Sequence, residues 1–343
     1  MKICFYRHSL LSRGGDKMIV EYANYLSSQG HDVVIAANSV NTVFKLQARI
    51  EQTSKFRYKI NTIFNAVFLK KYCDVIIADI IAMVAFLSIR HRGRILYFAQ
   101  DYDEAYYKNG FLKLLIRSIY YYCLSILKIP VIAVSDELGQ LLRKRFNANV
   151  TVVKNGVDRD VFFPEKDDEY ISLKDDSKVI LVFARHDYRK GFDIAINVLS
   201  EFRNAIEKRE LMVWAVGARI EVPFHMKNFG FVAPEQLRKI LSCSDVLLYP
   251  SRHEGLPLLV LEALSCGCPV VTTEAVHFLK NKNNALICKI EDELCLKNSL
   301  VSILVDSNLR TGLSKAGLDL ARAYSLSESK KEFHKAVSLA GHQ

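Results

Sequence analysis

Short apolar runs alternate with stretches of helical periodicity along the whole chain. In the first half, the runs Lys2–Tyr6, His31–Ala37 and Asp74–Ala78 are bounded by polar or turn-forming residues. Apolar runs of this length without alternation indicate strands buried on both faces of a parallel sheet. Between the first two runs, Met18–Ser28 has apolar residues at helical spacing. The pattern predicts a β-α-β succession that continues with strands at 94–99, 130–134 and 150–153.

The second half of the chain repeats this alternation. Val179–Phe183 predicts a strand, and Phe192–Glu207, which follows a short polar loop, predicts a helix. Strands that alternate with helices in this way are typical of doubly wound α/β folds. Further strands are predicted at 211–216, 245–249 and 269–273, and further helices at 234–242, at 258–265 and in three segments after residue 291.

A turn at Asn155-Gly156 separates the two halves. Asn-Gly is a strong turn signal, and an acidic and polar run at 165–176 follows it. A chain of 343 residues is long enough for about two domains, and its 50% hydrophobic content supplies each with an ample core. We therefore predict one domain over residues 1–157 and a second that begins at residue 158.

Three features of the sequence indicate where in the cell the protein is located: its cysteines, its N-terminus and its hydropathy profile. The eight cysteines form no Cys-x-x-Cys pair and most lie within apolar runs, which favours reduced core thiols in a cytosolic protein. The first residues turn polar too soon for a signal peptide, and uncharged apolar runs stay shorter than the roughly 18 residues that a spanning helix needs. The sequence thus predicts a cytoplasmic protein without a membrane-spanning segment.

Excess positive charge is confined to the first half of the chain. Residues 1–160 contain 23 Lys and Arg against 13 Asp and Glu, whereas the remainder contains 24 of each. Such asymmetry indicates an anionic partner for that half, namely a membrane surface, a diphosphate-linked lipid or a nucleic acid. A merely basic surface remains the alternative.

Two segments, 42–71 and 111–128, interleave basic residues with aromatic and aliphatic ones. The first carries seven Lys and Arg against the single acid Glu51, and the second carries Lys113, Arg117 and Lys128. Two interpretations remain open for each: contact with an anionic bilayer at the inner face of the cell membrane, or an ordinary core helix with solvated lysines. The composition also suits single-stranded nucleic acid. Since no nucleic-acid module is recognisable, we expect no nucleic-acid partner.

One stretch, residues 251–271, combines a tight turn with a helix start and a helix end. Gly255 permits the turn after the preceding strand, Pro257 suits the first turn of a helix, and Gly267 is placed to cap that helix. A helix N-terminus at the carboxyl end of a parallel strand suits a phosphate group. The stretch therefore predicts a phosphate-binding strand-loop-helix unit.

Charged residues accompany this unit and a second strand-to-helix loop. Glu254 and Glu262 would lie roughly 12 Å apart on one continuous helix, which favours separate tasks. The alternative is that Glu254 caps the helix and Glu262 is solvated. In the loop after the strand at 179–183, Arg185 and Lys190 are cations placed to hold a diphosphate. Isolated basic residues in a loop are otherwise usually solvated.

The first half offers two weaker candidates. Gly14 and Gly15 lie between the first strand and the first helix, where bare backbone can approach a ligand. Asp101 follows the strand at 94–99, where polar residues point toward the ligand-binding edge of an α/β sheet. It is suited to orient or deprotonate an acceptor hydroxyl, and the alternative is that it caps the following loop.

Together these motifs resemble a known family. Glu254-x7-Glu262, within Ser-x-x-Glu-Gly-x-x-Leu…Glu-Ala-Leu-x-x-Gly-x-Pro-Val-Val, is similar to the donor-site signature of glycosyltransferase family 4. Arg185 and Lys190-Gly match the family at the same spacing, as does Asn-Gly-Val-Asp…Phe-x-Pro where its domains join. The resemblance covers nearly the whole chain, and Gln-Asp-Tyr at 100–102 looks like the bacterial polysaccharide branch.

The resemblance implies a GT-B fold, with two facing Rossmann-like, doubly wound α/β domains and an interdomain cleft. Residues 1–157 would bind the acceptor, residues 158–326 the nucleotide-sugar donor, and a C-terminal helix at 327–343 would pack back on the first domain. It implies a retaining glycosyltransferase that uses a nucleotide-diphosphate sugar and the hydroxyl of a lipid-linked or saccharide acceptor. Bacterial cell-surface polysaccharide or glycolipid synthesis is the expected setting, with neither a metal nor a cofactor required.

The resemblance also implies roles for individual residues. Arg185 and Lys190 would stabilise the departing diphosphate, Glu254 would touch the sugar or its phosphate, and Asp101 would act on the acceptor; these four are the predicted catalytic residues. One departure is that Gly-Leu-Pro at 255–257 replaces the Gly-Phe-Gly of many members, which removes one backbone N–H from the donor side. The predicted donor-binding residues are Gly14, Gly15, Arg185, Lys190, Val232, Gly255, Leu256, Pro257, Leu258 and Glu262, the last of them toward the ribose.

Two other functions remain open at this point. A nucleotide-sugar epimerase of the same GT-B architecture would share the Glu and Arg/Lys positions but would have no use for a basic first half. A non-catalytic nucleotide- or anion-binding module would keep its biological role after loss of Glu254. Detecting transfer to an acceptor separates both from a glycosyltransferase.

Overall fold

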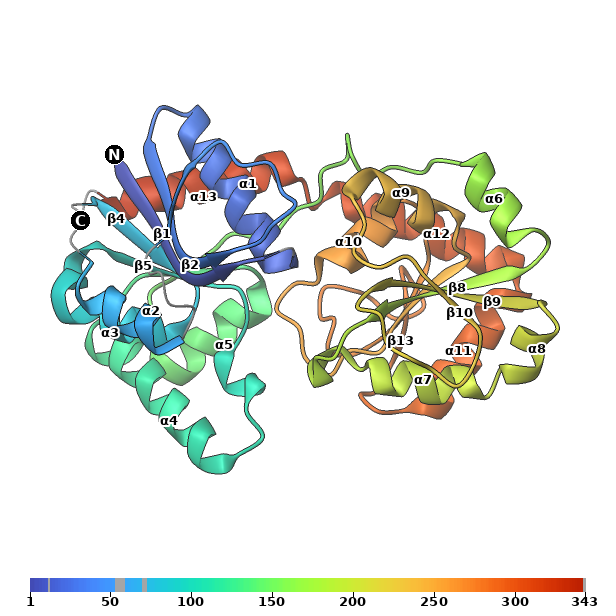
Figure 1. Cartoon of the computed structure of the whole chain (residues 1–343). Coiled ribbons are helices and arrows are strands. Elements are labelled where there is room, and N and C mark those ends of the chain that lie inside the picture. The colour runs from blue at the N-terminus through green and yellow to red at the C-terminus, as the bar shows by residue number, and fades with distance from the viewer. Residues whose placement is uncertain (12, 53–58, 70–72, 342–343) are drawn as a thin grey trace. The chain divides into compact units, whose positions relative to one another are not determined.

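A computed structural model of the chain describes residues 1–11, 13–52, 59–69 and 73–341. The chain divides into two compact units, Met1–Asn155 with Ser327–Gln343, and Gly156–Leu326. Each unit contains one parallel sheet with helices on both faces (Figure 1). The prediction of two doubly wound α/β domains is therefore confirmed, and the division falls close to the expected boundary at residues 157 and 158.

The first unit is built on a seven-stranded sheet in the order β3-β2-β1-β4-β5-β6-β7. Strands β4 and β5 are buried along their whole length, which explains why they stand out in the sequence as continuous apolar runs. The strands are β1 (Lys2–Leu10), β2 (Asp32–Val40), β3 (Arg49–Gln52), β4 (Val75–Ala78), β5 (Ile95–Ala99), β6 (Val131–Ala133) and β7 (Val150–Val152).

Helices cover both faces of this sheet, α1 and α13 on one side and α2, α3 and α5 on the other (Figure 1). Local capping fixes several ends; for example, Ser135 accepts from Leu138 N at the start of α5. The helices are α1 (Gly14–Ser28), α2 (Lys59–Val67), α3 (Ile81–His91), α4 (Gly110–Tyr120), α5 (Asp136–Phe146) and α13 (Leu326–Gly341), with the short 3₁₀ helices η1 (Arg92–Arg94) and η2 (Asp103–Tyr106) and the π-helix η3 (Tyr121–Ile126), which continues α4.

The C-terminal helix α13 completes the core of the first unit. The ring of Phe333 stacks on Tyr22 of α1 with 3.9 Å between centroids, and it also contacts Phe5 and Phe98 of the sheet. Tyr22 OH and Ser329 Oγ share a hydrogen bond of 2.7 Å. These residues are fully or almost fully buried, so the end of the chain is part of the first hydrophobic core.

The second unit contains a six-stranded sheet in the order β10-β9-β8-β11-β12-β13. Helices α9, α10 and α12 lie on one face and α7, α8 and α11 on the other (Figure 1). The strands are β8 (Lys178–Ala184), β9 (Leu211–Gly217), β10 (Met226–Asn228), β11 (Val246–Tyr249), β12 (Val270–Thr273) and β13 (Leu286–Cys288). The helices are α6 (Asp168–Lys174), α7 (Phe192–Ser200), α8 (Arg203–Glu207), α9 (Pro234–Cys243), α10 (Leu258–Ser265), α11 (Glu293–Val305) and α12 (Ser307–Arg322), with η4 (Tyr188–Lys190).

The differences from the predicted elements lie at the margins of the sheets. Strands β3, β10 and β13 were not predicted, because each is short and β3 and β10, at the sheet edges, lack a buried apolar run. The helix predicted at 192–207 breaks at residues 201–202 into α7 and α8. The segment 42–71, for which a core helix was one of the open interpretations, contains the strand β3 as well as α2, and parts of it lie outside the described residues.

Two cysteines correct the prediction of reduced thiols throughout. Cys288 and Cys295 form a disulfide, with 5.8 Å between their Cα atoms. The turn from β13 into α11 brings them together, since Cys288 ends the strand and Cys295 lies in the first turn of the helix. The six remaining cysteines, all within the described residues, form no disulfide and are buried, as predicted. In the described part of the chain, no helix combines the length and apolar character needed to cross a bilayer.

Candidate active site

The strand order of the second unit reverses at one point, between β8 and β11. The chain proceeds from β8 outward to β9 and β10, and from β11 outward in the opposite direction to β12 and β13. Ligands of open α/β sheets bind beside the carboxyl ends of the strands at such a switch point. The loops that leave β8 and β11, residues 185–191 and 250–257, meet here, since Arg252 N donates to Arg189 O.

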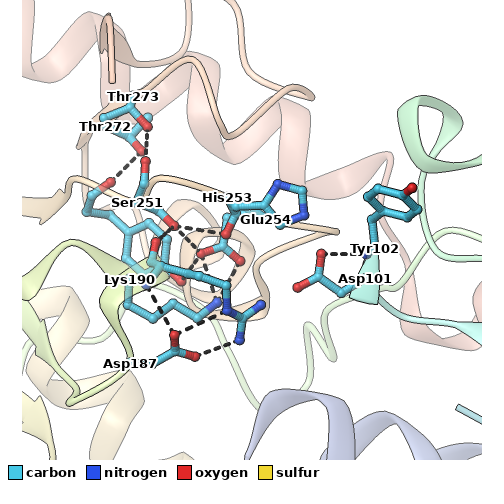
Figure 2. Close-up of polar contacts among 11 residues, drawn as sticks. Asp101, Tyr102, Asp187, Lys190, Ser251, His253, Glu254, Thr272 and Thr273 are labelled. Carbon is cyan, nitrogen blue, oxygen red and sulfur yellow. Dashed lines mark hydrogen bonds and ion pairs between the residues drawn. The ribbon is translucent and has the colours of Figure 1, made fainter. Parts of the chain in front are cut away.

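Glu254 is the centre of the contacts between these two loops (Figure 2). Lys190 donates to both of its carboxylate oxygens at 2.8 Å, while Tyr249 and Ser251 donate to Oε1 at 2.9 and 2.6 Å. Glu254 is only 7% exposed. Burial, together with the neighbouring Glu254 charge, raises the pKa of the Tyr249 hydroxyl, so this hydroxyl remains a donor. The predicted catalytic pair Lys190 and Glu254 is therefore in direct contact.

The two carboxylates of the motif do not lie on one continuous helix. Helix α10 begins at Leu258, and no side chain caps it. Glu262 lies on α10 and is buried. The alternative in which Glu254 caps the helix and Glu262 is solvated is therefore wrong. The Glu254 carboxylate is compensated by Lys190, Tyr249 and Ser251, and the roles of both glutamates toward a ligand stay predictions.

Hydroxyl groups of the neighbouring strand fix the backbone that carries Glu254 (Figure 2). Thr272 Oγ1 donates to Tyr249 O at 2.6 Å, and Thr273 Oγ1 donates to Ser251 O. Both threonines end β12 and are fully buried. Because buried carbonyls need partners, these contacts hold the loop in one conformation. Sequence reasoning found the two threonines only as the end of a strand.

A glycine allows Lys190 to reach Glu254. Gly191 has a φ of +65°, and a Cβ at this position would lie 1.8 Å from the Pro250 carbonyl oxygen. Only glycine combines this left-handed conformation with such a close approach of two backbones. The Lys-Gly pair is thus a geometric requirement: the glycine brings the two loops together, and the lysine before it meets the carboxylate.

Arg185 lies at the same edge of the sheet, directly after β8. Its guanidinium lies over the rings of Phe183 and Phe231, at 5.5 and 5.8 Å from their centroids. Phe231 precedes Val232, and the loop that contains both is tied by a backbone hydrogen bond to the end of β9. Cation–π contacts of this kind favour one position of the guanidinium. Arg185 and the loop of Val232, predicted from separate motifs, are therefore neighbours.

Arg252, which sequence reasoning did not single out, also joins the two loops. It donates to both carboxylate oxygens of Asp193 at 2.7 Å and to Glu291 at 2.8 Å, and it stacks 3.8 Å from the Tyr188 ring centroid. Hydrogen bonds from Arg252 and its charge hold the pKa values of Asp193 and Glu291 below their ordinary range. The partners lie 59 and 39 positions away in the sequence, so local spacing carried no signal of this network.

Arg189, which the sequence analysis did not single out, stabilises the loop after β8. Its guanidinium donates to the Asp187 carboxylate at 3.1 and 2.6 Å. Burial raises the pKa of Asp187, but the hydrogen bonds and charge of Arg189 outweigh it and hold this pKa below its ordinary value. Asp187 also accepts from the Arg189 backbone N at the start of η4. The pair therefore shapes the turn that presents Lys190.

The predicted donor-binding residues at 255–258 form the entry into α10. Leu256, Pro257 and Leu258 are buried, and Pro257 is the N-cap residue, so the helix starts one residue later than its proline suggested. The first amides of α10 therefore keep their N–H groups despite the proline. At the other end, Gly267 has a φ of +74° and Cys268 N donates to Ala263 O, which confirms the predicted glycine cap.

The residues predicted in the first unit lie at its own carboxyl edge. Gly14 begins α1, and a Cβ on Gly15 would lie 2.7 Å from Gln100 Oε1. Asp101 Oδ1 accepts from Tyr102 N at 2.8 Å, which is the kind of contact expected of the loop cap named as the alternative. The roles of Gly14, Gly15 and Asp101 toward a ligand stay predictions.

A polar cluster at the switch point of the first unit was missed. Arg7, in the second half of β1, pairs with Asp16 of α1 at 2.6 Å and with Asp79, just after β4, at 3.2 Å. Gln100 donates to the same Asp79 carboxylate at 3.1 Å. Burial raises the pKa of Asp16 and the charge of Arg7 opposes this rise. The only signal in the sequence was a basic residue directly after an apolar run.

The carboxyl edge of the second unit is therefore equipped to bind an anion. Lys190 and Arg185 supply positive charge, and the N-terminus of α10 supplies unpaired amides and the positive end of a helix dipole. Within the described ranges, His, Cys, Asp and Glu side chains nowhere group in threes as metal ligands. Fixed cations and amides stabilise negative charge that develops on a leaving group.

Known proteins match the chain along most of its length. The sequence model of the family described as "Glycosyltransferase Family 4" matches residues 12–161, and that described as "Glycosyl transferases group 1" matches residues 177–306. A relative from Campylobacter jejuni, "GalNAc-alpha-(1->4)-GalNAc-alpha-(1->3)-diNAcBac-PP-undecaprenol alpha-1,4-N-acetyl-D-galactosaminyltransferase", is 22% identical, with 98% of each chain covered.

Solved structures share the fold over the same extent. Sucrose-phosphate synthase of Thermosynechococcus elongatus matches with a TM-score of 0.80 and 15% identity, covering 98% of each chain. Anabaena Alr3699/HepE, solved in complex with UDP and glucose, matches with a TM-score of 0.79 and 16% identity over 98% of this chain and 99% of its own. With its two parallel-sheet units and both sequence matches, the chain belongs to glycosyltransferase family 4 and has the GT-B fold.

Proposed function

We propose that this glycosyltransferase moves a sugar from a nucleotide-diphosphate sugar to a hydroxyl of a lipid-linked saccharide, with retention at the anomeric carbon. The name of the Campylobacter relative describes an undecaprenol-linked saccharide acceptor. The Anabaena structure contains UDP and glucose. Both support a nucleotide-sugar donor and a lipid-linked acceptor, and bacterial surface polysaccharide or glycolipid synthesis is the setting that fits them.

The observation that carries the proposal is the Lys190–Glu254 pair at the switch point of the second unit, beside Arg185. During glycosyl transfer, negative charge grows on the diphosphate as its bond to the sugar breaks. Cations that are already in place lower this barrier because they need no reorganisation during the reaction. Glu254 holds the Lys190 ammonium through both carboxylate oxygens, which keeps the cation ordered before a donor binds.

The proposed reaction uses the diphosphate both as leaving group and as proton acceptor. The bond between the anomeric carbon and the diphosphate oxygen breaks, and its electron pair stays on that oxygen. The acceptor hydroxyl attacks from the same face, and its proton passes to the departing phosphate. Arg185, Lys190 and the first amides of α10 stabilise the nucleoside diphosphate, Glu254 lies next to the transferred sugar, and Glu262 binds the ribose. Asp101 orients the acceptor hydroxyl.

The proposed setting of the reaction is the inner face of the cell membrane. A lipid-linked acceptor is anchored in a bilayer, whereas nucleotide sugars are water-soluble. An enzyme that joins the two has to work at a membrane surface, and binding from one side as a peripheral protein is sufficient for this task.

A donor panel in the presence of a lipid-linked acceptor tests the proposed function. The purified chain is incubated with UDP-, GDP- and ADP-linked sugars and a short-chain polyprenyl diphosphate saccharide. We expect one class of nucleotide to raise the melting temperature, because a ligand that binds only the native state stabilises it. The same class is expected to support transfer, and proton NMR of the product is expected to show the anomeric configuration of the donor.

Other outcomes of this experiment count against the proposal. An inverted anomeric configuration would exclude the retaining reaction. Epimerised free nucleotide sugar without any acceptor product would favour the epimerase. Nucleotide binding without transfer to any acceptor would favour a binding module.

A further inference from the structure

The disulfide between Cys288 and Cys295 closes a short loop at one edge of the second sheet. Cys288 is the last residue of β13, the edge strand of that sheet, and Cys295 lies in the first turn of α11 (Figure 1). Asp292 caps this helix by accepting from Cys295 N at 3.0 Å. We call residues 288–295 the disulfide loop. Both of its ends are fixed, and the disulfide removes much of the conformational freedom that residues 289–294 would otherwise have.

Glu291 lies midway along the disulfide loop in an unusual backbone conformation. Its φ is +66°, in the left-handed region that residues other than glycine rarely adopt. Such a residue persists only where the surrounding structure holds it, and such residues are common at functional sites. Here Glu293 N donates to Glu291 O at 3.0 Å, and Asp292 N donates to Lys289 O at 3.2 Å. The loop itself therefore holds the turn that presents the Glu291 side chain.

The Glu291 carboxylate contacts both loops of the candidate active site. Its Oε1 accepts from Arg252 Nε at 2.8 Å and from Tyr188 OH at 3.3 Å. Arg252 comes two residues before Glu254 in the loop after β11, and Tyr188 comes two residues before Lys190 in the loop after β8. Arg252 Nη1 also donates to Tyr188 O at 2.8 Å. The disulfide loop is therefore the third member of the junction that brings the two active-site loops together.

The contact of Glu291 depends on the disulfide loop more than on the ion pair itself. The Glu291 side chain is 57% exposed. Exposed ion pairs contribute little on their own, because holding two flexible side chains in one geometry costs entropy. A closed loop lowers that cost, since it fixes the position of the carboxylate beforehand. Opening the disulfide is therefore expected to weaken the contacts of Glu291 with Arg252 and Tyr188.

The two sulfur atoms of the disulfide differ in accessibility. Cys288 is only 3% exposed, whereas Cys295 is half-buried and lines an open hollow of about 550 Å³ together with Asn298, Ser299 and Leu309. A thiol reductant can therefore approach the Cys295 sulfur. The other six cysteines, which the structure also describes, are buried and form no disulfide. A reductant is therefore expected to act at the Cys288–Cys295 pair.

We propose that the Cys288–Cys295 disulfide is a redox switch of the donor site. In the oxidised enzyme, the disulfide loop holds Glu291 against the two active-site loops. A protein dithiol opens the bond: one of its thiolates attacks Cys295 Sγ, and the electron pair of the S–S bond leaves with Cys288 Sγ, which takes up a proton. The second thiol of the reductant then displaces Cys295 as a thiol. The enzyme gains two electrons and two protons, the reductant becomes a disulfide, and donor binding weakens.

The switch rests on the proposed function in one respect, its setting. The proposed transfer takes place at the inner face of the cell membrane, which belongs to a reducing compartment. Disulfides are rare there and, when present, are usually transient and catalytic or redox-sensing. Formation of this disulfide under oxidising conditions would raise donor use by the enzyme.

Hydrogen exchange of the full chain without substrates tests the switch. The oxidised chain is compared with the chain after treatment with dithiothreitol, and alkylation followed by mass spectrometry identifies the free thiols. We expect Cys288 and Cys295 to be alkylated only after reduction. Amide exchange in residues 185–191 and 250–257 is expected to become about fivefold faster, because the junction opens more often. Exchange near Lys174 and Asp245, at the opposite ends of the same strands, is expected to stay within about twofold.

Matched variants separate the switch from general effects of reduction. Cys288→Ser/Cys295→Ser is expected to exchange like the reduced chain and to show no response to dithiothreitol. Glu291→Gln keeps the disulfide but weakens the contact with the active-site loops, so it is expected to reproduce much of the faster exchange. Glu293→Gln is its control, because Glu293 lies in the same loop but accepts from Asn197 of α7. This control is expected to exchange like the unmodified chain in both active-site loops.

Donor use measures the consequence for the reaction. We expect reduction to raise KM for the donor about fivefold with a smaller change in kcat, and reoxidation to restore KM. In the triple variant, the effects of Glu291→Gln and of the two serines are not expected to add, since they act through one contact.

Three results would contradict the switch. The first is a disulfide that stays closed in dithiothreitol, and the second is equal exchange of the active-site loops in the oxidised and reduced chains. The third is an equal effect of Glu291→Gln and Glu293→Gln. If the unmodified chain transfers no sugar at all, the proposed function fails, while alkylation and hydrogen exchange still decide the switch.

Discussion

Two lysine–carboxylate pairs lie at opposite ends of the same two strands, β8 and β11. Lys190 contacts Glu254 at 2.8 Å beyond the carboxyl ends, and Lys174 contacts Asp245 at 3.0 Å before the amino ends. Their environments are similar, since the lysine side chains are 19% and 24% exposed and the carboxylates 5% and 10%. By chemistry and burial alone, the two pairs are nearly equivalent.

Their surroundings differ, and the parallel sheet is the reason. Lys174 is the last residue of α6, where a cation compensates the negative end of the helix dipole, and Asp245 accepts from Val179 N at the start of β8. At the carboxyl end, the Glu254 carboxylate accepts hydrogen bonds from the Lys190 ammonium and from the hydroxyls of Tyr249 and Ser251. The N-terminus of α10, which is the positive end of its dipole, follows four residues later. In units where helices connect parallel strands, the helix N-termini point to this edge, and this is the edge at which open α/β sheets bind their ligands.

The largest expected difference is in catalysis. We expect Lys190→Ala to lower the rate of sugar transfer by about 10²- to 10³-fold, because the cation opposite the leaving diphosphate is lost. Lys174→Ala is expected to leave the rate within about threefold. Each variant also breaks a partly buried pair, and each is expected to lose about 2 kcal/mol in the free energy of unfolding of the second unit. Initial rates with the donor found in the panel measure the first effect.

The fluorescence of Trp214 during denaturation measures the expected loss in the free energy of unfolding. It is the single tryptophan of the chain and is fully buried in β9 of the second unit. Equal rate losses in Lys174→Ala and Lys190→Ala would show that both act through stability, and the distinction between the two edges would then be lost.

A smaller effect is expected when the approach of the two loops is blocked. Gly191→Ala adds a Cβ at 1.8 Å from the Pro250 carbonyl oxygen at a φ of +65°. We expect a loss of about 3 kcal/mol or more in unfolding free energy, as strain and steric overlap add. Gly230→Ala is the matched control, because its φ is +75° but nothing lies within 4 Å of the added Cβ. It is expected to lose only about 1 kcal/mol. Denaturation followed by Trp214 fluorescence measures the unfolding free energy of both variants. Similar losses of unfolding free energy in the two would argue against a close approach of the backbones at Gly191.

The smallest effect concerns acid stability at the carboxyl edge. Arg252 holds the pKa values of Asp193 and Glu291 below their ordinary range. A carboxylate with a lowered folded-state pKa contributes stability above the unfolded-state value, and this contribution disappears as the pH falls through the folded-state value. Arg252→Met is therefore expected to be less stable than the unmodified chain at about pH 7, with the difference shrinking below about pH 4. The effect is small because both carboxylates are more than half exposed. A difference that stays constant from neutral to acid pH would show that packing on Tyr188, and not charge, is what Arg252 contributes.

The sequence predicted the elements whose cause is local. Helix α10 was predicted at 258–265 and found there, because its start after Pro257 and its end at the left-handed Gly267 are encoded by neighbouring residues. The buried strands β8 and β11 stood out for the same reason, as continuous apolar runs. The sequence placed Lys190 and Glu254 in two strand-to-helix loops but did not predict their contact. The two loops lie together because the carboxyl ends of neighbouring parallel strands share one edge of the sheet.

Long-range packing decided the rest. The Arg252 network, the hydroxyl contacts of Thr272 and Thr273, and the burial of Glu262 depend on partners many positions away, so no spacing in the chain announces them. The disulfide between Cys288 and Cys295 was likewise not predicted. It depends on the turn between β13 and α11, which brings the two Cα atoms within bonding range, and the spacing of two cysteines does not determine such a turn. Local patterns determine which elements form, whereas solvent exclusion between distant segments determines which side chains they bring into contact.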